Sequence, residues 1–405
     1  MGVLRTARFR WLVIARTTGY LGNAIAPLAL AFAVLDLGGS VSDLGIVVGA
    51  RSIANVALLL VGGVLADRLP RALMLQGSSA AAALTSALMA TAVLGGFASV
   101  PLLAGIGLVN GAVSAMALPA GLSLTPQVVA ADQLQQANAL LRIGSNTAGI
   151  TGASAGGLLA ATAGPGWAMV AVAVVFAIEA VCYVGVGGKR VVRAPSRPLA
   201  DLRDGWSEFV SRRWVWVIVL QFMLVNAATV GGLQVLGPAV ADETIGRTGW
   251  GVALACQTAG ALAGGLFAAR WLPRRALFFG TALILLDAPP LLMLGLAPHL
   301  LLMIPIMFLA GWAVEQFTIA WDVSLQENVP DEKLARVYSY DVIGSIVAVP
   351  IGQLAVGPIA AHVGTTATLV GCAVLIVVTT LAALTSRQVR ELRTRHGSVV
   401  GEPAS

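Results

Sequence analysis

The sequence predicts an all-α membrane protein with twelve transmembrane helices, arranged as two pseudo-symmetric six-helix bundles with both termini in the cytoplasm. Three observations carry this prediction: an apolar composition, a one-sided distribution of basic residues and an internal repeat. Of the 405 residues, 58% are hydrophobic and only 11% are charged. A soluble domain carries about a quarter charged residues, so the composition fits a lipid environment.

Apolar runs alternate with short polar or Gly/Pro-containing connections along the whole chain. One span needs roughly 20 apolar residues, and a helix satisfies its own backbone hydrogen bonds in lipid. The expected helices cover residues 11–35, 43–65, 72–96, 101–124, 138–162, 166–187, 214–238, 247–269, 276–297, 300–323, 337–361 and 364–386.

Basic residues gather in alternate connections and at both ends of the chain. All but three of the 25 Lys and Arg residues lie on one side of the predicted membrane. The exceptions are Arg247 on the opposite side, and Arg51 and Arg142 within predicted helices. Because short cytoplasmic loops are enriched in Lys and Arg, we place both termini in the cytoplasm.

An internal repeat divides the chain into two halves. The segment "GGVLADRLPRAL" at 62–73 returns as "GGLFAARWLPRRAL" at 264–277, and two further pairs of segments match in order at nearly the same offset. Two repeated helical halves are typical of one large class of transporter folds. The expected domains are 1–187 and 214–386, an amphipathic cytoplasmic linker at 188–213 and a basic cytoplasmic tail at 387–405.

The connection after the second predicted helix resembles a known family motif. Its pattern is Gly63-x-Leu65-Ala66-Asp67-Arg68-x-Pro70-Arg71, and it resembles the loop between helices 2 and 3 of the major facilitator superfamily. The segments "ANALLRIGSNTAGITGASAGGLL" and "VSLQENVPDEKLARVYSYDVIGS" look more narrowly like the branch of macrolide and siderophore exporters. The resemblance implies the twelve-helix fold of that superfamily.

The same motif implies a gating loop formed by Gly63, Asp67, Arg68 and Arg71. Asp67 can pair with a nearby arginine or face the positive end of a neighbouring helix; in family terms this contact closes the cytoplasmic side. The alternative is that both arginines only follow the positive-inside rule. The chain departs from the family's antiporter motif, because Ala153 stands where that motif has Pro.

Ionisable residues inside a membrane are rare and usually functional. We predict Glu315, Asp287 and Glu179 as sites of proton coupling or cation recognition, with a structural helix contact as the alternative for Glu315. Desolvation favours the protonated form of a carboxyl group, which allows proton uptake near neutral pH. Asp287 precedes Pro289 and Pro290, so we expect a distorted helix there.

Three further intramembrane charges are expected at helix contacts. Arg142 and Asp341 occupy corresponding places in the two halves, and a pair between them is possible. Arg51 has Asp36 or Asp43 as expected partners, or it extends outward toward the membrane surface.

Polar residues on the helices that line the family's central cavity are candidate cavity residues. They are Tyr20, Asn23, Asn110, Asn226 and Thr318. For each asparagine the alternative is a hydrogen bond between helices. The family's drug antiporters carry an arginine in the region of Asn110, and this chain has none there.

The leading hypothesis is an exporter of a lipophilic or amphipathic small molecule, coupled to protons, in a bacterial inner membrane. The alternatives are a proton- or cation-coupled importer of a small metabolite, and a non-transporting sensor or scaffold. We expect a monomer surrounded by membrane lipids, without cofactor, metal or nucleic acid. The sequence contains no phosphate-binding loop and no catalytic cluster, so an enzyme is not expected.

Overall fold

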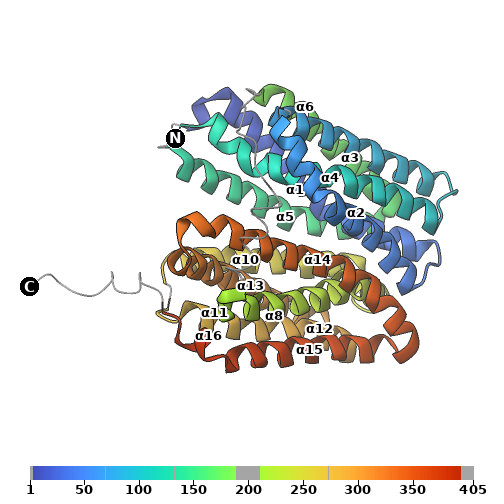
Figure 1. Ribbon diagram of the computed structural model, residues 1–405. Coiled ribbons are helices and arrows are strands. Elements are labelled where there is room, and N and C mark those ends of the chain that lie inside the picture. The colour runs from blue at the N-terminus through green and yellow to red at the C-terminus, as the bar shows by residue number, and fades with distance from the viewer. Residues whose placement is uncertain (1–2, 69, 131–132, 188–209, 272, 394–405) are drawn as a thin grey trace, which may run out of the picture. The chain divides into compact units, whose positions relative to one another are not determined.

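The computed structural model describes residues 3–68, 70–130, 133–187, 210–271 and 273–393. The chain forms two compact units (Figure 1). Unit 1 comprises residues 1–194 and 237–255, and unit 2 comprises residues 195–236 and 256–405. The predicted amphipathic linker helix and most of the basic tail lie outside the described residues.

Unit 1 contains six long helices that follow the predicted spans closely. They are α1 (Ala7–Asp36), α2 (Val41–Arg68), α3 (Arg71–Leu94), α4 (Val100–Val128), α5 (Leu134–Thr162) and α6 (Pro165–Val186), preceded by the short 3₁₀ helix Val3–Arg5. Helix α1 packs along α5 and α6, α2 packs along α4, and α3 packs against both α4 and α6. The short α9 (Gly237–Glu243) and the first part of α10 (Gly246–Ala268) also belong to this unit.

Unit 2 contains the other helices that the structure describes. They are α8 (Arg213–Val230), a π-helical segment (Gly231–Leu236), the rest of α10, α11 (Ala276–Leu283), the 3₁₀ segment η4 (Ile284–Asp287), α12 (Ala288–Leu296), α13 (Leu300–Asn328), α14 (Asp331–Val363), α15 (Thr365–Thr385) and α16 (Arg387–Glu391). Helix α8 packs against α14 and α15, and α12 packs against α15.

The distorted helix expected around Asp287 is present. The span from α11 to α12 changes to a 3₁₀ turn at η4, which ends one residue before Ala288 gives way to Pro289 and Pro290 at the start of α12. Proline has no backbone N–H, and its ring clashes with the carbonyl one turn earlier, so a continuous α-helix cannot form there. The turn leaves Asp287 only 4% exposed.

Two matching turns support the repeat. Gly164 joins α5 to α6 with φ of 91°, and Gly364 joins α14 to α15 with φ of 90°. A side chain at either position would strain the backbone, because L residues rarely adopt positive φ. The corresponding tight turn in each half therefore requires a glycine.

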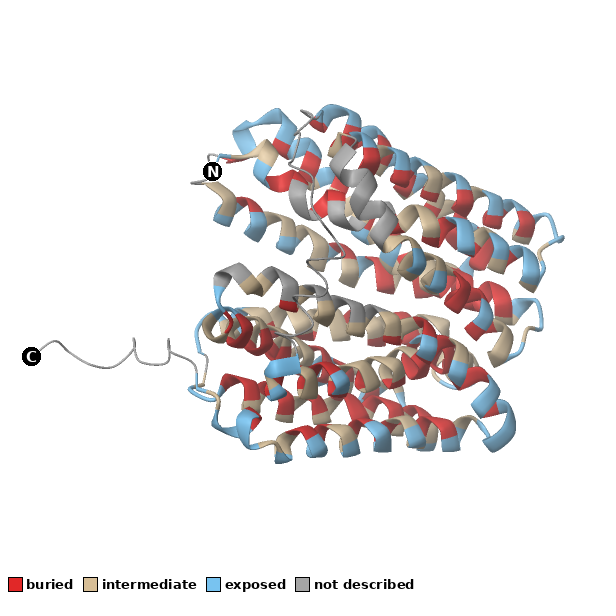
Figure 2. Ribbon diagram, in the orientation of Figure 1, coloured by how far each residue is buried: buried red, intermediate tan, exposed pale blue. Residues whose placement is uncertain are grey.

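The surface of the helices is apolar where a soluble protein would be polar. Within the residues that the structure describes, nine helices are long and apolar enough to cross a membrane, and two shorter apolar helices lie at Val100–Ala115 and Val347–Val363. Leu301 and Val181 are 73% and 68% exposed, and exposed and buried residues alternate along the helices (Figure 2). Exposed apolar surface of this extent marks contact with lipid. The total of twelve spans stays a prediction.

Candidate functional site

A polar cavity of about 330 Å³ lies within unit 1 and is lined by residues of α1, α2, α3, α4 and α6. Among the described side chains, two arginines, one glutamate and several amide and hydroxyl groups line it. These polar residues are Arg16, Tyr20, Asn23, Arg51, Asn55, Ser78, Ser79, Asn110, Ser114, Glu179 and Tyr183. Such a concentration of polar groups among apolar helices is the strongest candidate for a functional site in this unit.

Arg51 enters the cavity where α2 and α4 approach closely. Gly111 allows this approach, because a Cβ atom there would overlap the backbone carbonyl of Arg51. The Nε group of Arg51 donates a hydrogen bond to Asn110 Oδ1 at 2.9 Å, and its Nη2 group donates to Asn23 Oδ1 at 3.5 Å. Asn110 in turn donates to the hydroxyl of Thr85 at 2.7 Å. Amides therefore hold the guanidinium group from two helices.

The expected pairing of Arg51 with Asp36 or Asp43 is wrong. Asp43 accepts hydrogen bonds from the backbone N–H and the hydroxyl of Ser40, at 2.8 and 2.7 Å. Asp36 pairs with Arg247. Both carboxylates thus bind other groups near the ends of their helices. Arg51 instead donates to the amide oxygens of Asn23 and Asn110.

Glu179 extends from α6 toward α1. Its carboxylate lies directly against Gly19, where a Cβ atom would collide with it. The hydroxyls of Ser79 and Tyr183 interact with this carboxylate, and the charge of Arg16 attracts it. The cavity thus holds an acidic and a basic group side by side on neighbouring helices.

Unit 1 brings together five of the residues predicted from the sequence, and they come from four helices. Tyr20 and Asn23 on α1, Arg51 on α2, Asn110 on α4 and Glu179 on α6 all line the same cavity. The sequence predicted Glu179 as a site of proton coupling or cation recognition, and it predicted Arg51 at a helix contact.

Several polar residues of the cavity lining were absent from the predicted site. They are Arg16, Asn55, Ser78, Ser79, Ser114 and Tyr183. Helical spacing contains a signal for two of them. Arg16 lies one turn before Tyr20 on α1, and Tyr183 lies one turn after Glu179 on α6, so each pair shares a helix face.

The remaining predicted cavity residues lie in unit 2. Asn226 on α8 donates to the backbone carbonyl of Ser345 at 3.4 Å. The hydroxyl of Thr318 donates to the carbonyl of Val314 in its own helix at 2.9 Å. The bond of Asn226 matches the helix-contact alternative, and a role of either residue in a cavity stays a prediction.

The three carboxylates predicted as functional in unit 2 lie on different elements. Glu315 on α13 packs against Gly264 and Gly265 of α10. Asp287 is buried at the end of η4. Asp341 on α14 accepts a hydrogen bond from Trp321 Nε1 at 3.0 Å. The proposed pair of Asp341 with Arg142 of α5 stays a prediction.

The predicted gating residues fall at a helix boundary. Gly63, Asp67 and Arg68 lie in the last turns of α2, and Arg71 is the first residue of α3. The side chains of the first three are outside the described part of the structure, so the latch stays a prediction.

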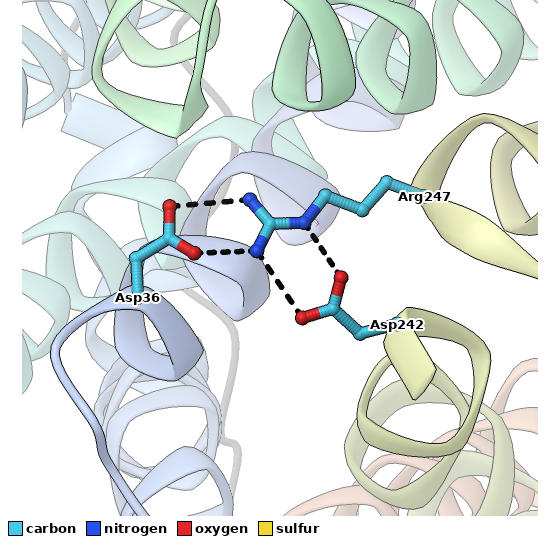
Figure 3. A network of polar contacts seen from close by, with 3 residues as sticks. All are labelled: Asp36, Asp242 and Arg247. Carbon is cyan, nitrogen blue, oxygen red and sulfur yellow. Dashed lines mark hydrogen bonds and ion pairs between the residues drawn. The ribbon is translucent and has the colours of Figure 1, made fainter. Parts of the chain in front are cut away.

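An ion network that the sequence analysis missed lies at the opposite end of α1 from the N-terminus. Arg247 at the start of α10 donates from Nη1 to Asp36 Oδ2 at 3.1 Å, and from Nε to Asp242 Oδ1 at 2.7 Å (Figure 3). Its guanidinium also lies 4.9 Å from the ring centre of Phe32. The available signal was that Arg247 is the single basic residue on its side of the predicted membrane.

Within the described residues, no three His, Cys, Asp or Glu side chains gather as a metal site. The charged groups of the cavity therefore offer ion pairs and hydrogen bonds to a ligand, with no cluster of metal-ligating side chains among them.

A family model described as Major Facilitator Superfamily matches residues 12–340. A search of curated proteins finds no match to this chain. Solved structures of the same fold include the nucleoside transporter NupG, with 14% identity, a TM-score of 0.76, and coverage of 93% of this chain and 98% of that chain.

Two further structures are similar over nearly their whole length. A bacterial homolog of the human lysosomal transporter Spinster, inward-facing and unoccupied, has 14% identity and a TM-score of 0.74, covering 95% of this chain and 97% of that chain. A bacterial homologue of the iron transporter ferroportin, inward-facing, has 15% identity and a TM-score of 0.72, covering 94% and 99%. These likenesses show the fold, and with the family match they indicate a transporter rather than an enzyme.

Proposed function

Because this chain belongs to the major facilitator superfamily, we propose that it is a secondary transporter of a small molecule that works by alternating access. We place the cavity of unit 1 on its substrate path. The observation that carries the proposal is the presence of Arg16, Arg51 and Glu179 in one cavity among apolar helices. Charged side chains at such positions are costly and mark the routes of substrates, ions or protons.

Glu179 is the coupling residue that the geometry supports best. A carboxylate away from bulk water is costly, and protonation removes that cost. The hydroxyls of Ser79 and Tyr183 and the charge of Arg16 surround it, so both the charged and the neutral form have polar partners. We therefore propose that proton uptake and release at Glu179 drive the transport cycle.

The cavity favours a hydrophilic substrate over the lipophilic compound that the apolar composition suggested. Its volume of about 330 Å³ lies near the lower end of the range for small-molecule sites. Amides and hydroxyls from α1, α3 and α4 line it, and these groups gain most from a ligand with matching donors and acceptors. This supports a small polar metabolite rather than a bulky macrolide.

Proton coupling operates in either direction. Exchange of substrate for protons gives export, which the exporter-like segments of the sequence favour, and joint movement gives import. The test uses purified protein in liposomes with an imposed proton gradient, an internal pH-sensitive dye, and a panel of small carboxylates, amides and amines. Proton movement that opposes substrate movement identifies an exporter, and proton movement in the same direction identifies an importer.

We expect Glu179→Gln to abolish substrate-dependent proton movement. Exchange of labelled for unlabelled substrate across the membrane should persist, because it needs no net proton transfer. The control is Glu391→Gln, which neutralises an exposed carboxylate on α16 and should leave both readouts unchanged. Full proton movement in Glu179→Gln would contradict coupling at this residue. Absence of substrate movement with every compound in the panel would contradict the transporter proposal.

A further inference from the structure

We propose that the cavity of unit 1 selects small organic monoanions, and that Arg51 binds their anionic group. The inference rests on the proposed function, because it names the substrate class of the same cavity. It depends on three observations: the balance of charges in the cavity, the free hydrogen-bonding capacity of Arg51, and the neutral residue at the equivalent place in unit 2.

Among the side chains that the structure describes, the charges that line the cavity do not cancel. Arg16 and Arg51 are basic, Glu179 is acidic, and the lining residues from α3 and α4 contribute only hydroxyls, one amide and apolar groups. The charge of Arg16 acts on Glu179, so these two residues compensate each other. One positive charge, that of Arg51, is left for a ligand to neutralise.

Arg51 has the donors that such a ligand needs. A guanidinium group carries five N–H donors, and Arg51 uses one toward Asn110 and one toward Asn23. Both acceptors are neutral amide oxygens, and among the residues that the structure describes no carboxylate forms an ion pair with Arg51. The amides therefore orient the group without satisfying its charge. A fixed guanidinium with free N–H groups matches the two oxygens of a carboxylate.

Helix packing does not require a charge at this position. In unit 2, Gly311 of α13 meets the backbone of Gln257 on α10, as Gly111 of α4 meets the backbone of Arg51 on α2. The same close approach of two helices thus forms with a neutral glutamine. A charge on a helix of a membrane protein is costly and usually functional, so we attribute the presence of Arg51 in unit 1 to a ligand.

The test uses purified full-length protein in detergent at constant ionic strength. The ligands are benzoate, nicotinate and lactate, each compared with its amide, which has nearly the same shape and no charge. We expect the carboxylates to bind and to raise the midpoint of thermal unfolding, because a ligand that binds the folded state stabilises it. The amides should bind at least about tenfold more weakly, as expected for loss of a charge-assisted hydrogen bond.

Variants assign the effect to Arg51. Arg51→Gln should weaken carboxylate binding about 10- to 100-fold, and Arg51→Lys should keep part of it because the charge remains. The matched control is Arg270→Gln, which removes an exposed guanidinium that bonds to its own helix at Leu266; it should bind like the wild type. If Arg51→Gln does not fold, the acid and amide series on the wild type still tests selection of anions, and Arg51→Lys tests the part of Arg51.

The results separate this inference from the proposed function. Binding of amides as strongly as carboxylates, failure of every carboxylate to bind, or unchanged binding in Arg51→Gln would overturn the anion site. If neutral compounds are transported and carboxylates do not bind, the transporter proposal stands while the anion inference fails. If carboxylates bind through Arg51 and no compound crosses a liposome membrane, the anion site stands and the transporter proposal fails.

Discussion

At the scale of single residues, glycines at helix contacts make room for the charged groups of the cavity. Gly19 leaves room for the carboxylate of Glu179, and Gly111 lets α4 approach the backbone of Arg51. Gly121 plays the same part for the guanidinium of Arg16, whose Nη1 atom would lie 2.5 Å from a Cβ atom there. Small residues at helix contacts allow such close approach in membrane proteins. Here they leave space for the side chains of Glu179 and Arg16 and for the backbone of Arg51.

We predict that Gly111→Ala destabilises the protein by about 1–3 kcal/mol, the usual cost of overpacking. The added methyl group would overlap the backbone carbonyl of Arg51, which cannot move without shifting α2. Thermal unfolding in detergent measures the change. The control is Gly105→Ala on the same helix, where a Cβ atom meets nothing within 4 Å. A variant at Gly111 as stable as the one at Gly105 would contradict the close contact.

At the scale of helices, irregular segments and buried polar contacts decide the packing of unit 2. The proline pair breaks the helix before α12, and a π-helical segment follows α8. Helices α8 and α15 are joined by Gln221, whose Nε2 group donates to the hydroxyl of Thr380 at 3.1 Å. Gln221 is 3% exposed and Thr380 is fully buried, so no water replaces this bond.

We predict that Thr380→Val destabilises the protein by about 1 kcal/mol, because it leaves the amide of Gln221 without an acceptor. Adding Gln221→Leu should recover most of the loss, since removing both polar partners is nearly neutral. Thr379→Val is the matched control, because the hydroxyl of Thr379 bonds only within its own helix. No recovery in the double variant would show that the packing around these residues, and not the hydrogen bond, carries the stability.

At the scale of the whole molecule, the two halves of the repeat have the same glycine turn but different residues at equivalent helix contacts, such as Arg51 and Gln257. Gly164 and Gly364 form the same turn, yet Asn23 contacts Arg51 while Asn226 bonds to Ser345. Corresponding asparagines of the two halves therefore have different partners. Within unit 1 a further contact joins segments far apart in sequence: Asp36 of α1 and Asp242 of α9 both bind Arg247 of α10 (Figure 3).

We predict that Asp36→Asn lowers stability by about 1 kcal/mol, the upper range for partly exposed ion pairs. Arg247 would keep Asp242 and lose the partner that links it to α1. The loss should shrink at high salt, because mobile ions screen exposed charges. Unfolding midpoints at low and high salt measure both effects.

The control for this ion pair is Glu391→Gln, which breaks the more exposed pair with Arg387. It should change stability by less than about 0.5 kcal/mol. An equal loss in the two variants, or a loss in Asp36→Asn that salt does not change, would contradict a stabilising charge contact at Arg247.

The sequence by itself determined the helices and the repeat. Apolar runs can satisfy their backbone in lipid only as helices, so span positions follow from composition alone. The observed helices begin and end within a few residues of most predicted spans. The proline pair after Asp287 likewise indicated the distorted helix, because the effect of proline is local.

Only the tertiary structure decided which polar residues meet. Arg16 was absent from the predicted site and Arg51 was expected at a helix contact, yet both line one cavity with Glu179. Asp36, an expected partner of Arg51, binds Arg247 instead. These encounters depend on the rotation of each helix and on glycine contacts that let helices approach. Helical periodicity gives the faces of one helix, whereas which faces meet is settled by packing among all helices at once.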